Sequence, residues 1–245
     1  MDRLIHTALS GMRASMDHQR VIASNMANAN TLGFRAELLD QRAVTIEGTP
    51  NEARAMQTMR VRGANMAAGE VVETGRSLDV AMATDALMAV QAEDGTEAYT
   101  RRGDLSVSAT GLLVNGEGRP VLGDTGPITI PPTGIPSIAP DGTITIADPN
   151  TPDQPPAEIG RIKLAAWEGS PINKGLDGLF RVEGGGILPT DEAATVQVGA
   201  LEQSNVSTTE VLVEMIEAQR LFAMRSKMIS TAREIDESGA QLMRL

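Results

Sequence analysis

The sequence predicts an α+β fold in which N- and C-terminal helices pair as a coiled coil and a central, mostly antiparallel β domain lies between them. Apolar residues recur at helical spacing near each end of the 245-residue chain, and turn signals separate short apolar segments in its middle. The expected organisation is an N-terminal helix within 1–35, an extended connector over 36–75, a β domain over 76–201 and a C-terminal helix within 202–245.

The C-terminal helix has the clearer start signal. Ser207 and Glu210 have the S/T-x-x-E spacing of a capping box, and no proline follows as far as Leu245. Beyond this start an apolar stripe recurs at steps of three and four residues, with the members Leu212, Met215, Ile216, Phe222 and Ile229. At about 1.5 Å per residue the helix would be roughly 50 Å long, so it needs a partner along its length.

The other end of the chain provides a matching helix. Asp2 can cap a segment whose apolar stripe comprises Ile5, Leu9, Met12, Met16 and Met26. An isolated amphipathic helix is only marginally stable, because ordering its backbone costs about as much as its few buried side chains contribute. We therefore expect the two stripes to pack together and to form the assembly interface.

An asparagine-rich turn follows the first helix. Asparagine and glycine tolerate left-handed backbone, and asparagine caps backbone groups with its own side chain, so the cluster predicts a helix stop and a tight turn. A generic helix end explains Gly33 but not the spacing of three asparagines. The candidate turn residues are Asn25, Asn28, Asn30, Thr31, Gly33 and Phe34.

The composition argues against several functional classes. A net charge of −11 gives no electrostatic footprint for nucleic acid, and aromatic residues are only 2% of the chain. There is no cysteine, and His6 and His18 point to different sides of one helix, so no metal site is expected. The chain has no metalloprotease, nucleophile-elbow or phosphate-loop motif. We expect no enzyme activity, no cofactor and no small-molecule substrate.

Five blocks, taken in order, resemble the flagellar rod and hook family. Asn25 to Arg35 is similar to the family's A-N-x-x-T-x-G-[FY]-[KR] signature, which makes the turn residues above a family signature turn. Blocks similar to the family's central domain lie at 74–81, 99–103 and 111–116, and 199–206 resembles the start of its C-terminal helix. The first residues of the chain, Met1 to Gly11, are similar to those of proximal-rod members.

This resemblance implies a structural subunit of the proximal rod of the bacterial flagellar basal body, which assembles helically and transmits motor torque. The implied partners are copies of itself, neighbouring rod proteins and the flagellar type III export apparatus, with export to the periplasm without a cleaved signal peptide. Two alternatives remain open. One is a distal-rod or hook-family subunit, and the other is a carbohydrate-binding β module with a helical oligomerisation stalk.

Overall fold

The computed structural model describes residues 2–46, 54–132, 134–147 and 155–242. The chain divides into two compact units, each described here by itself. The helical unit comprises Met1–Asn28, Glu37–Gly63 and Val206–Leu245, and the β unit comprises Ala29–Ala36 and Ala64–Asn205. Each unit therefore combines segments that are distant in the sequence.

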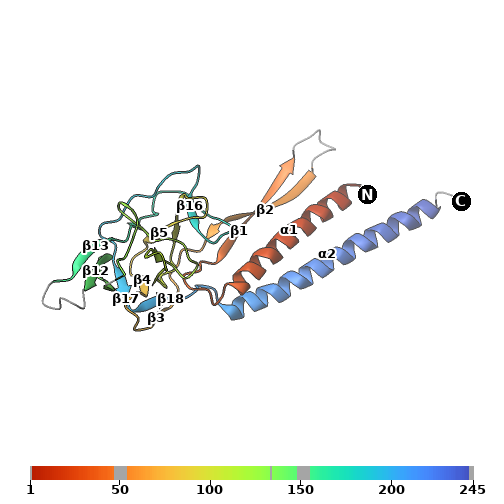
Figure 1. The fold of residues 1–245 in the computed structure, drawn as a ribbon. Coiled ribbons are helices and arrows are strands. Elements are labelled where there is room, and N and C mark those ends of the chain that lie inside the picture. Colours follow the sequence, from red (N-terminus) through yellow and green to blue (C-terminus); the bar gives the residue numbers. More distant parts are fainter. Residues whose placement is uncertain (1, 47–53, 133, 148–154, 243–245) are drawn as a thin grey trace. The chain divides into compact units, whose positions relative to one another are not determined.

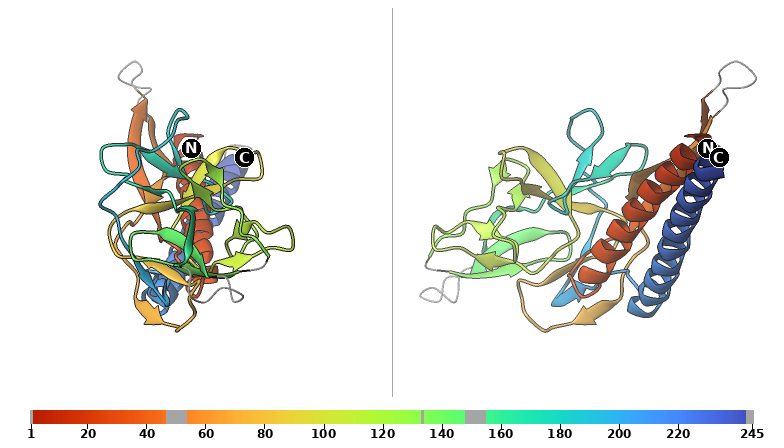
Figure 2. Two further views of the ribbon diagram at one scale, coloured as in Figure 1. Left: turned by 60° about the vertical axis from the view of Figure 1, so that its left-hand side comes forward. Right: turned by 90° about the vertical axis from the view of Figure 1, so that its right-hand side faces the viewer.

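The helical unit is built from two long helices and a two-stranded sheet. Helices α1 (Asp2–Ala27) and α2 (Thr208–Leu242) lie side by side (Figures 1 and 2). They run antiparallel, since Gln19 donates to the carbonyl of Ala218 while Arg225 donates to that of Gly11. Strands β1 (Glu37–Ile46) and β2 (Arg54–Ala64) pair with each other, and β1 contacts α1. The segment expected as an extended connector thus contains this sheet.

The expected start signal determines where α2 begins. The Ser207 hydroxyl accepts a hydrogen bond from the Glu210 amide at 3.4 Å, and the Ser207 carbonyl accepts the first helical bond from Val211 at 3.0 Å. Val206 and Val211 are both buried, in the positions of a hydrophobic staple. The N-cap interpretation of Ser207 is confirmed.

The predicted coiled coil is wrong. The two helices are present and in contact, but their predicted apolar stripes do not face each other, because Leu9, Met16, Leu212 and Ile216 are 41–65% exposed. The buried side chains of α1 are mainly small or polar: Ser10, Ala14, Ser15, Val21, Ile22 and Asn25. Such residues do not provide the large apolar side chains that pack as knobs into holes. The fold class is corrected to two units: a helix pair with the β1–β2 sheet, and a β unit of several small sheets.

The β unit is divided among short antiparallel strands. Its largest sheet has the order β14-β5-β6-β16-β15, a second has the order β11-β12-β13, and four pairs complete it, β17-β4, β18-β3, β7-β8 and β9-β10. The strands are β3 (Val71–Glu73), β4 (Val80–Met82), β5 (Leu87–Gln91), β6 (Glu97–Thr100), β7 (Ser106–Val107), β8 (Leu113–Val114), β9 (Leu122–Gly123), β10 (Gly126–Pro127), β11 (Ile135–Ile138), β12 (Thr143–Ala147), β13 (Ala157–Arg161), β14 (Leu164–Ala165), β15 (Ile172–Lys174), β16 (Phe180–Val182), β17 (Val196–Val198) and β18 (Ala200–Glu202).

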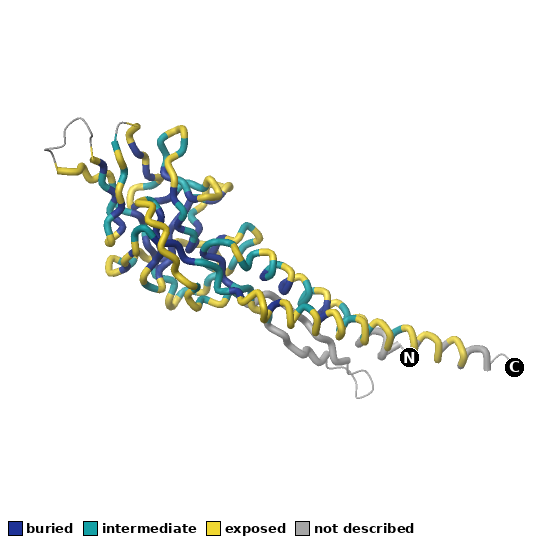
Figure 3. Tube along the Cα trace, turned by 90° about the horizontal axis from the view of Figure 1, so that it is seen from below, coloured by how far each residue is buried: buried dark blue, intermediate teal, exposed yellow. Residues whose placement is uncertain are grey.

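Strand β5 separates two hydrophobic cores of the β unit. Successive side chains of a strand point to opposite faces, so Met88 and Val90 enter the larger core while Leu87 and Ala89 enter the smaller one. This explains why β5 is an apolar run without alternation. Figure 3 shows buried segments concentrated inside the β unit and a mostly exposed α2. Within the described ranges, neither helix is apolar and long enough to span a bilayer.

Candidate assembly site

The family signature turn brings the incoming and outgoing segments of the β unit together. The Gly33 amide donates to the carbonyl of Glu202 at 2.8 Å, and the Asn205 amide donates to that of Phe34 at 3.2 Å. The Asn205 side chain adds a bond from the Ala36 amide at 2.7 Å. We call residues 31–36 and 202–205 together the junction. The junction joins the segment after α1 to the segment before α2, both of which belong to the β unit.

Glycine is required at position 33 for two separate reasons. Its backbone has φ of +65°, in the left-handed region. A Cβ atom there would also lie 2.4 Å from the carbonyl carbon of Arg101, closer than a real side chain approaches backbone. The turn can therefore pack against the Arg101 backbone only when residue 33 has no side chain.

A buried ion cluster lies beneath this turn. One carboxylate oxygen of Glu202 accepts from Arg35 at 2.6 Å and from the Gly69 amide at 2.8 Å, while the other accepts from Arg101 at 2.6 Å. All three charged side chains are at most 4% exposed. Removing one member of such a cluster would leave an uncompensated buried charge, which costs several kcal/mol. The cluster thus links the two junction segments to the strands between them.

Arg101 donates to backbone carbonyls as well as to Glu202. Its two terminal nitrogens donate to the carbonyl oxygens of Met82, Thr84 and Ala86 at 2.9–3.0 Å. Arg35 is less well satisfied, since its Nε and Nη1 atoms have no hydrogen-bond partner among the described residues. Burial lowers the pKa of the Arg35 guanidinium, and the neighbouring Glu202 carboxylate opposes that shift. Two guanidiniums share one carboxylate here.

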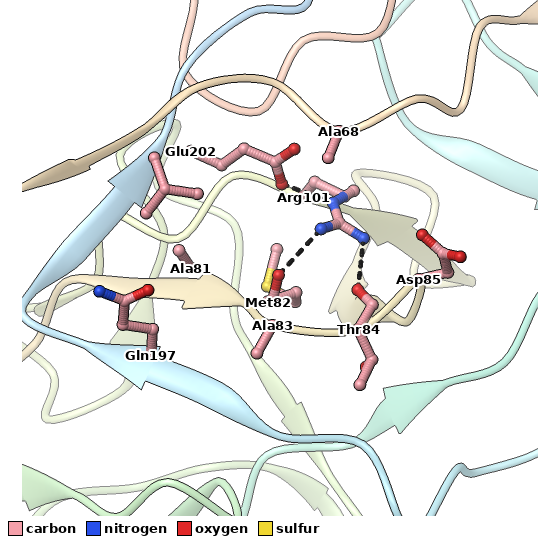
Figure 4. Close-up of a pocket in the computed structure, with 10 residues that line it drawn as sticks. Ala68, Ala81, Met82, Ala83, Thr84, Asp85, Arg101, Gln197 and Glu202 are labelled. Carbon is pink, nitrogen blue, oxygen red and sulfur yellow. Dashed lines mark hydrogen bonds and ion pairs between the residues drawn. The ribbon is translucent and has the colours of Figure 1, made fainter.

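A cavity of about 350 Å³ opens beside this cluster. Figure 4 shows Arg101 and Glu202 on one side of it, and Met82 and Thr84 accepting from Arg101. Its lining comprises Ala68, Val71, Ala81, Met82, Ala83, Thr84, Asp85, Arg101, Gln197 and Glu202. Both oxygens of Glu202 are already occupied by donors, so this carboxylate is placed to hold the two arginines rather than to transfer protons.

The remaining turn residues make separate contacts. Within the helical unit, Asn25 both donates to and accepts from the backbone of Glu37, at 3.2 and 2.8 Å, which joins the end of α1 to β1. Asn28 donates to the Ser24 carbonyl at 2.9 Å and so caps the last turn of α1.

In the β unit, Phe34 is buried, and the Lys174 ammonium lies 3.3 Å from the centre of its ring. The Thr31 carbonyl accepts from the Phe34 amide at 3.2 Å, whereas Asn30 is exposed.

The predicted stripe residues lie on two different sides of the helices. On α2, Met215, Phe222 and Ile229 are half-buried, and they share a face with Ala218 and Arg225, which bond to α1. Leu212 and Ile216 are on the exposed side instead. On α1, Met12 and Met26 are half-buried, whereas Leu9 and Met16 are exposed. Ile5 lies in α1, but its side chain is outside the described part of the structure.

The side of α2 away from α1 carries a series of large exposed apolar residues. We call this surface the outer strip. Its members, each 41–65% exposed, are Leu212, Val213, Ile216, Leu221, Met224, Met228 and Ile235. Of these residues, the stripe predicted from the sequence includes Leu212 and Ile216. It missed Leu221, Met224 and Met228, although their spacing of three and four residues is a helical signal.

Sequence reasoning also missed the ion cluster and Asn205. The Asn205 side chain donates to the carbonyls of Asn65 and Ala67 at 2.7 and 2.8 Å. Arg35, Arg101 and Glu202 each fall inside a block that resembles the family, and charged residues within such blocks were the available signal. Among the described residues no group of three His, Cys, Asp or Glu side chains could hold a metal ion.

Three family models match the chain, and all describe flagellar rod or hook proteins. The model "Flagella basal body rod protein" matches residues 5–35, which cover α1 and the signature turn. The D1 domain model of flagellar hook protein FlgE/F/G matches 81–146, and the C-terminal model of flagellar basal body rod FlgEFG protein matches 197–242. These three matches place the chain in the class of flagellar rod and hook proteins.

Relatives similar over their whole length narrow this class. The chain is 40% identical to the flagellar basal-body rod protein FlgF of Salmonella typhimurium, covering 99% of both chains. It is 39% identical to FlgF of Escherichia coli over 100% of this chain and 98% of that one, and 32% identical to FlgG of Bacillus subtilis over 100% of both. The chain belongs to the flagellar basal-body rod protein family, in its FlgF group.

Proposed function

We propose that this chain is a structural subunit of the flagellar basal-body rod. It assembles with copies of itself and with other rod proteins, and its terminal helices form the contacts. Membership of the FlgF group supports the rod assignment. The predicted interface residues on α1 and α2 belong to this proposal, with Leu212 and Ile216 as the members that an added subunit would cover.

The observation that carries the proposal is that α2 is apolar on two sides. Its α1-facing side buries Val211 and Ala218, yet the outer strip leaves seven large apolar side chains in water. Burying one such side chain fully contributes about 1.5–3 kcal/mol. A surface helix that served only its own chain would be polar on its far side. The outer strip is therefore a surface for another protein chain.

Contacts of this kind that repeat without closing produce a helical polymer. We propose that such a polymer forms in the periplasm, after export by the type III apparatus without a cleaved signal, and that it transmits motor torque. The resemblance of Met1 to Gly11 to the start of proximal-rod members supports a proximal over a distal position.

The carbohydrate-binding alternative has less support. Sugar binding uses aromatic faces, but Tyr99 and Phe180 are buried in the smaller core of the β unit and Trp167 packs against it. Structural, non-enzymatic function is likewise supported by the relatives, which are rod proteins, and by Glu202 being fully engaged with the two arginines.

A matched pair of substitutions on α2 tests the proposal. Ile216→Glu places a charge in the outer strip, whereas Gln219→Glu adds the same charge at an exposed polar position one turn away. We expect Ile216→Glu to abolish motility and to remove the chain from isolated basal bodies, because the charge would be buried without a partner. Gln219→Glu should support motility.

Both purified variants should keep the circular dichroism and the Trp167 fluorescence of the unchanged chain, since residue 216 is 65% exposed in the single chain. Normal incorporation of the Ile216→Glu variant into basal bodies would refute the role of the outer strip.

A further inference from the structure

The side chain of Asn205 joins three segments of the β unit. Its Oδ1 atom accepts a hydrogen bond from the Ala36 amide at 2.7 Å, and its Nδ2 atom donates to the carbonyls of Asn65 and Ala67 at 2.7 and 2.8 Å. The Asn65 amide in turn donates to the Ala36 carbonyl at 2.7 Å. We call the bonds among these four residues the clamp. The Asn205 carboxamide uses both its acceptor and its donor group on backbone partners.

The clamp lies where the chain passes between its two units. The chain crosses from one unit to the other after residues 28, 36, 63 and 205. Ala36 is the last residue of the β unit before the segment of the β1–β2 sheet, and Asn65 is the second residue after it. Asn205 is the last residue before the segment that contains α2. The clamp therefore bonds three of the four crossings to one another inside the β unit.

Two of the clamped segments are also in direct backbone contact. The Gln203 amide donates to the carbonyl of Glu70 at 2.8 Å. A Cβ atom at Gly69 would lie 2.1 Å from the carbonyl oxygen of Gln203, so a residue with a side chain has no room there. The segment that follows the β1–β2 sheet thus lies against the segment that leads to α2, and the Asn205 side chain closes the end of this contact that comes last in the sequence.

The clamp changes how a force on one crossing is carried. Such a force acts first on the hydrogen bonds nearest to that crossing. A single hydrogen bond in water contributes little, and local opening starts from the ends of bonded segments, so bonds that are loaded one after another open in turn. The Asn205 side chain loads several bonds together instead. A force at any one of the three crossings is resisted by bonds to both of the other segments.

Resting on the proposed function, in which the rod transmits torque, we propose that Asn205 is a positioning residue for the transmission of load. Force that enters the β unit at one crossing is distributed by the Asn205 side chain over three segments. None of the four clamp residues belongs to either hydrophobic core of the β unit. Removal of the clamp therefore leaves both cores closed, and the load role can be tested apart from folding.

Two substitutions in the full-length chain dissect the clamp. Asn205→Ala removes all three side-chain bonds. Asn205→Asp keeps an oxygen for the Ala36 amide but replaces the donor group with an oxygen that faces two carbonyls. An acidic group just before α2 is favoured by the helix dipole, so Asn205→Asp does not weaken the start of that helix. Asn173→Asp is the matched control, because Asn173 is an exposed asparagine of the same unit.

Amide hydrogen exchange of the purified chain measures the clamp residue by residue. Asn205→Ala should raise exchange about tenfold at the amides of Ala36 and Asn65. Asn205→Asp should raise it at Asn65 only, because the Ala36 amide keeps its acceptor. The Gly33 amide, which donates to the Glu202 carbonyl, should be unchanged in both variants. Unchanged exchange at Ala36 in Asn205→Ala, or an equal rise at Gly33, would overturn the clamp.

Swimming against raised viscosity tests the load role. Cells that carry Asn205→Ala should contain the chain in their basal bodies and swim normally in dilute medium, but they should lose swimming in medium thickened with an inert polymer. Cells with Asn173→Asp should swim like cells with the unchanged chain in both media.

Equal swimming of Asn205→Ala cells and unchanged cells in the thickened medium would overturn the load role. Absence of both Asn205 variants from basal bodies would also overturn it, because the clamp would then serve incorporation. Absence of the unchanged chain from basal bodies would instead refute the proposed function itself.

Discussion

The β unit and the helical unit of this chain treat apolar side chains in opposite ways. In the β unit, two cores bury residues such as Leu113 and Met88 completely. In the helical unit, α2 leaves seven large apolar residues exposed along its outer strip. The β unit thus buries its large apolar side chains through its own contacts, whereas α2 leaves large apolar side chains exposed in the single chain, and we propose that another chain covers them. Substitutions that act on one unit and not on the other test this difference.

The largest loss of stability is expected from a substitution in the buried ion cluster of the β unit. Glu202→Gln leaves Arg35 and Arg101 buried without a carboxylate, so we expect the free energy of unfolding to fall by about 3–5 kcal/mol. Trp167 is the single tryptophan and lies in the β unit, so its fluorescence during urea unfolding reports on this unit. Glu117→Gln is the control, because Glu117 forms partly exposed ion pairs that contribute at most about 1 kcal/mol. Equal losses for the two variants would show that the cluster does not stabilise the unit.

The next effect contrasts a core residue with one of the outer strip. Leu113→Ala removes a fully buried side chain and should cost about 2–5 kcal/mol in the urea unfolding of the purified chain. Met224→Ala truncates a side chain that is 57% exposed, so its cost should be within about 0.5 kcal/mol. A large loss for Met224→Ala in the unassembled chain would mean that α2 is already covered, and the contrast between the units would be lost.

A smaller loss of stability is expected at Gly33, where the positive φ and the close approach to the Arg101 backbone can be tested separately. Gly33→Ala and Gly118→Ala both place a side chain at positive φ, which costs about 1–2 kcal/mol. Only Gly33 also meets the Arg101 backbone, whereas a Cβ at Gly118 has no neighbour within 4 Å. We expect Gly33→Ala to cost about 1–3 kcal/mol more than Gly118→Ala in urea unfolding followed by Trp167 fluorescence. Equal costs would show that the close packing of the turn contributes nothing.

Local signals explain the features that could be predicted from the sequence. Ser207 indicated the start of α2 because an N-cap needs only residues that are close in sequence. The asparagines and Gly33 indicated the turn for the same reason. Frequent glycine turns and short apolar segments indicated the antiparallel β region. Each of these features depends on a few neighbouring residues, whose chemistry is visible in the sequence.

The features that were missed depend on distant residues or on an ambiguous pattern. Arg35 and Glu202 are 167 positions apart, and no local pattern shows that they meet. Residues 36–75 were expected to form an extended connector, because the short strand-like segments in this range do not show that they pair with each other. On α2, apolar residues occur on two sides, so a single stripe with one partner was inferred where two surfaces exist. That error produced the coiled-coil prediction.

The junction has an evolutionary consequence. Because the segment after α1 and the segment before α2 are hydrogen-bonded neighbours, Gly33 with Glu202 and Phe34 with Asn205, the chain between them is an insertion whose two ends lie close together, and it includes the β1–β2 sheet as well as most of the β unit. Loops within that insertion can lengthen, shorten or be replaced without altering the distance between its ends. Related proteins could thus diversify their β units while a common pair of terminal helices is retained.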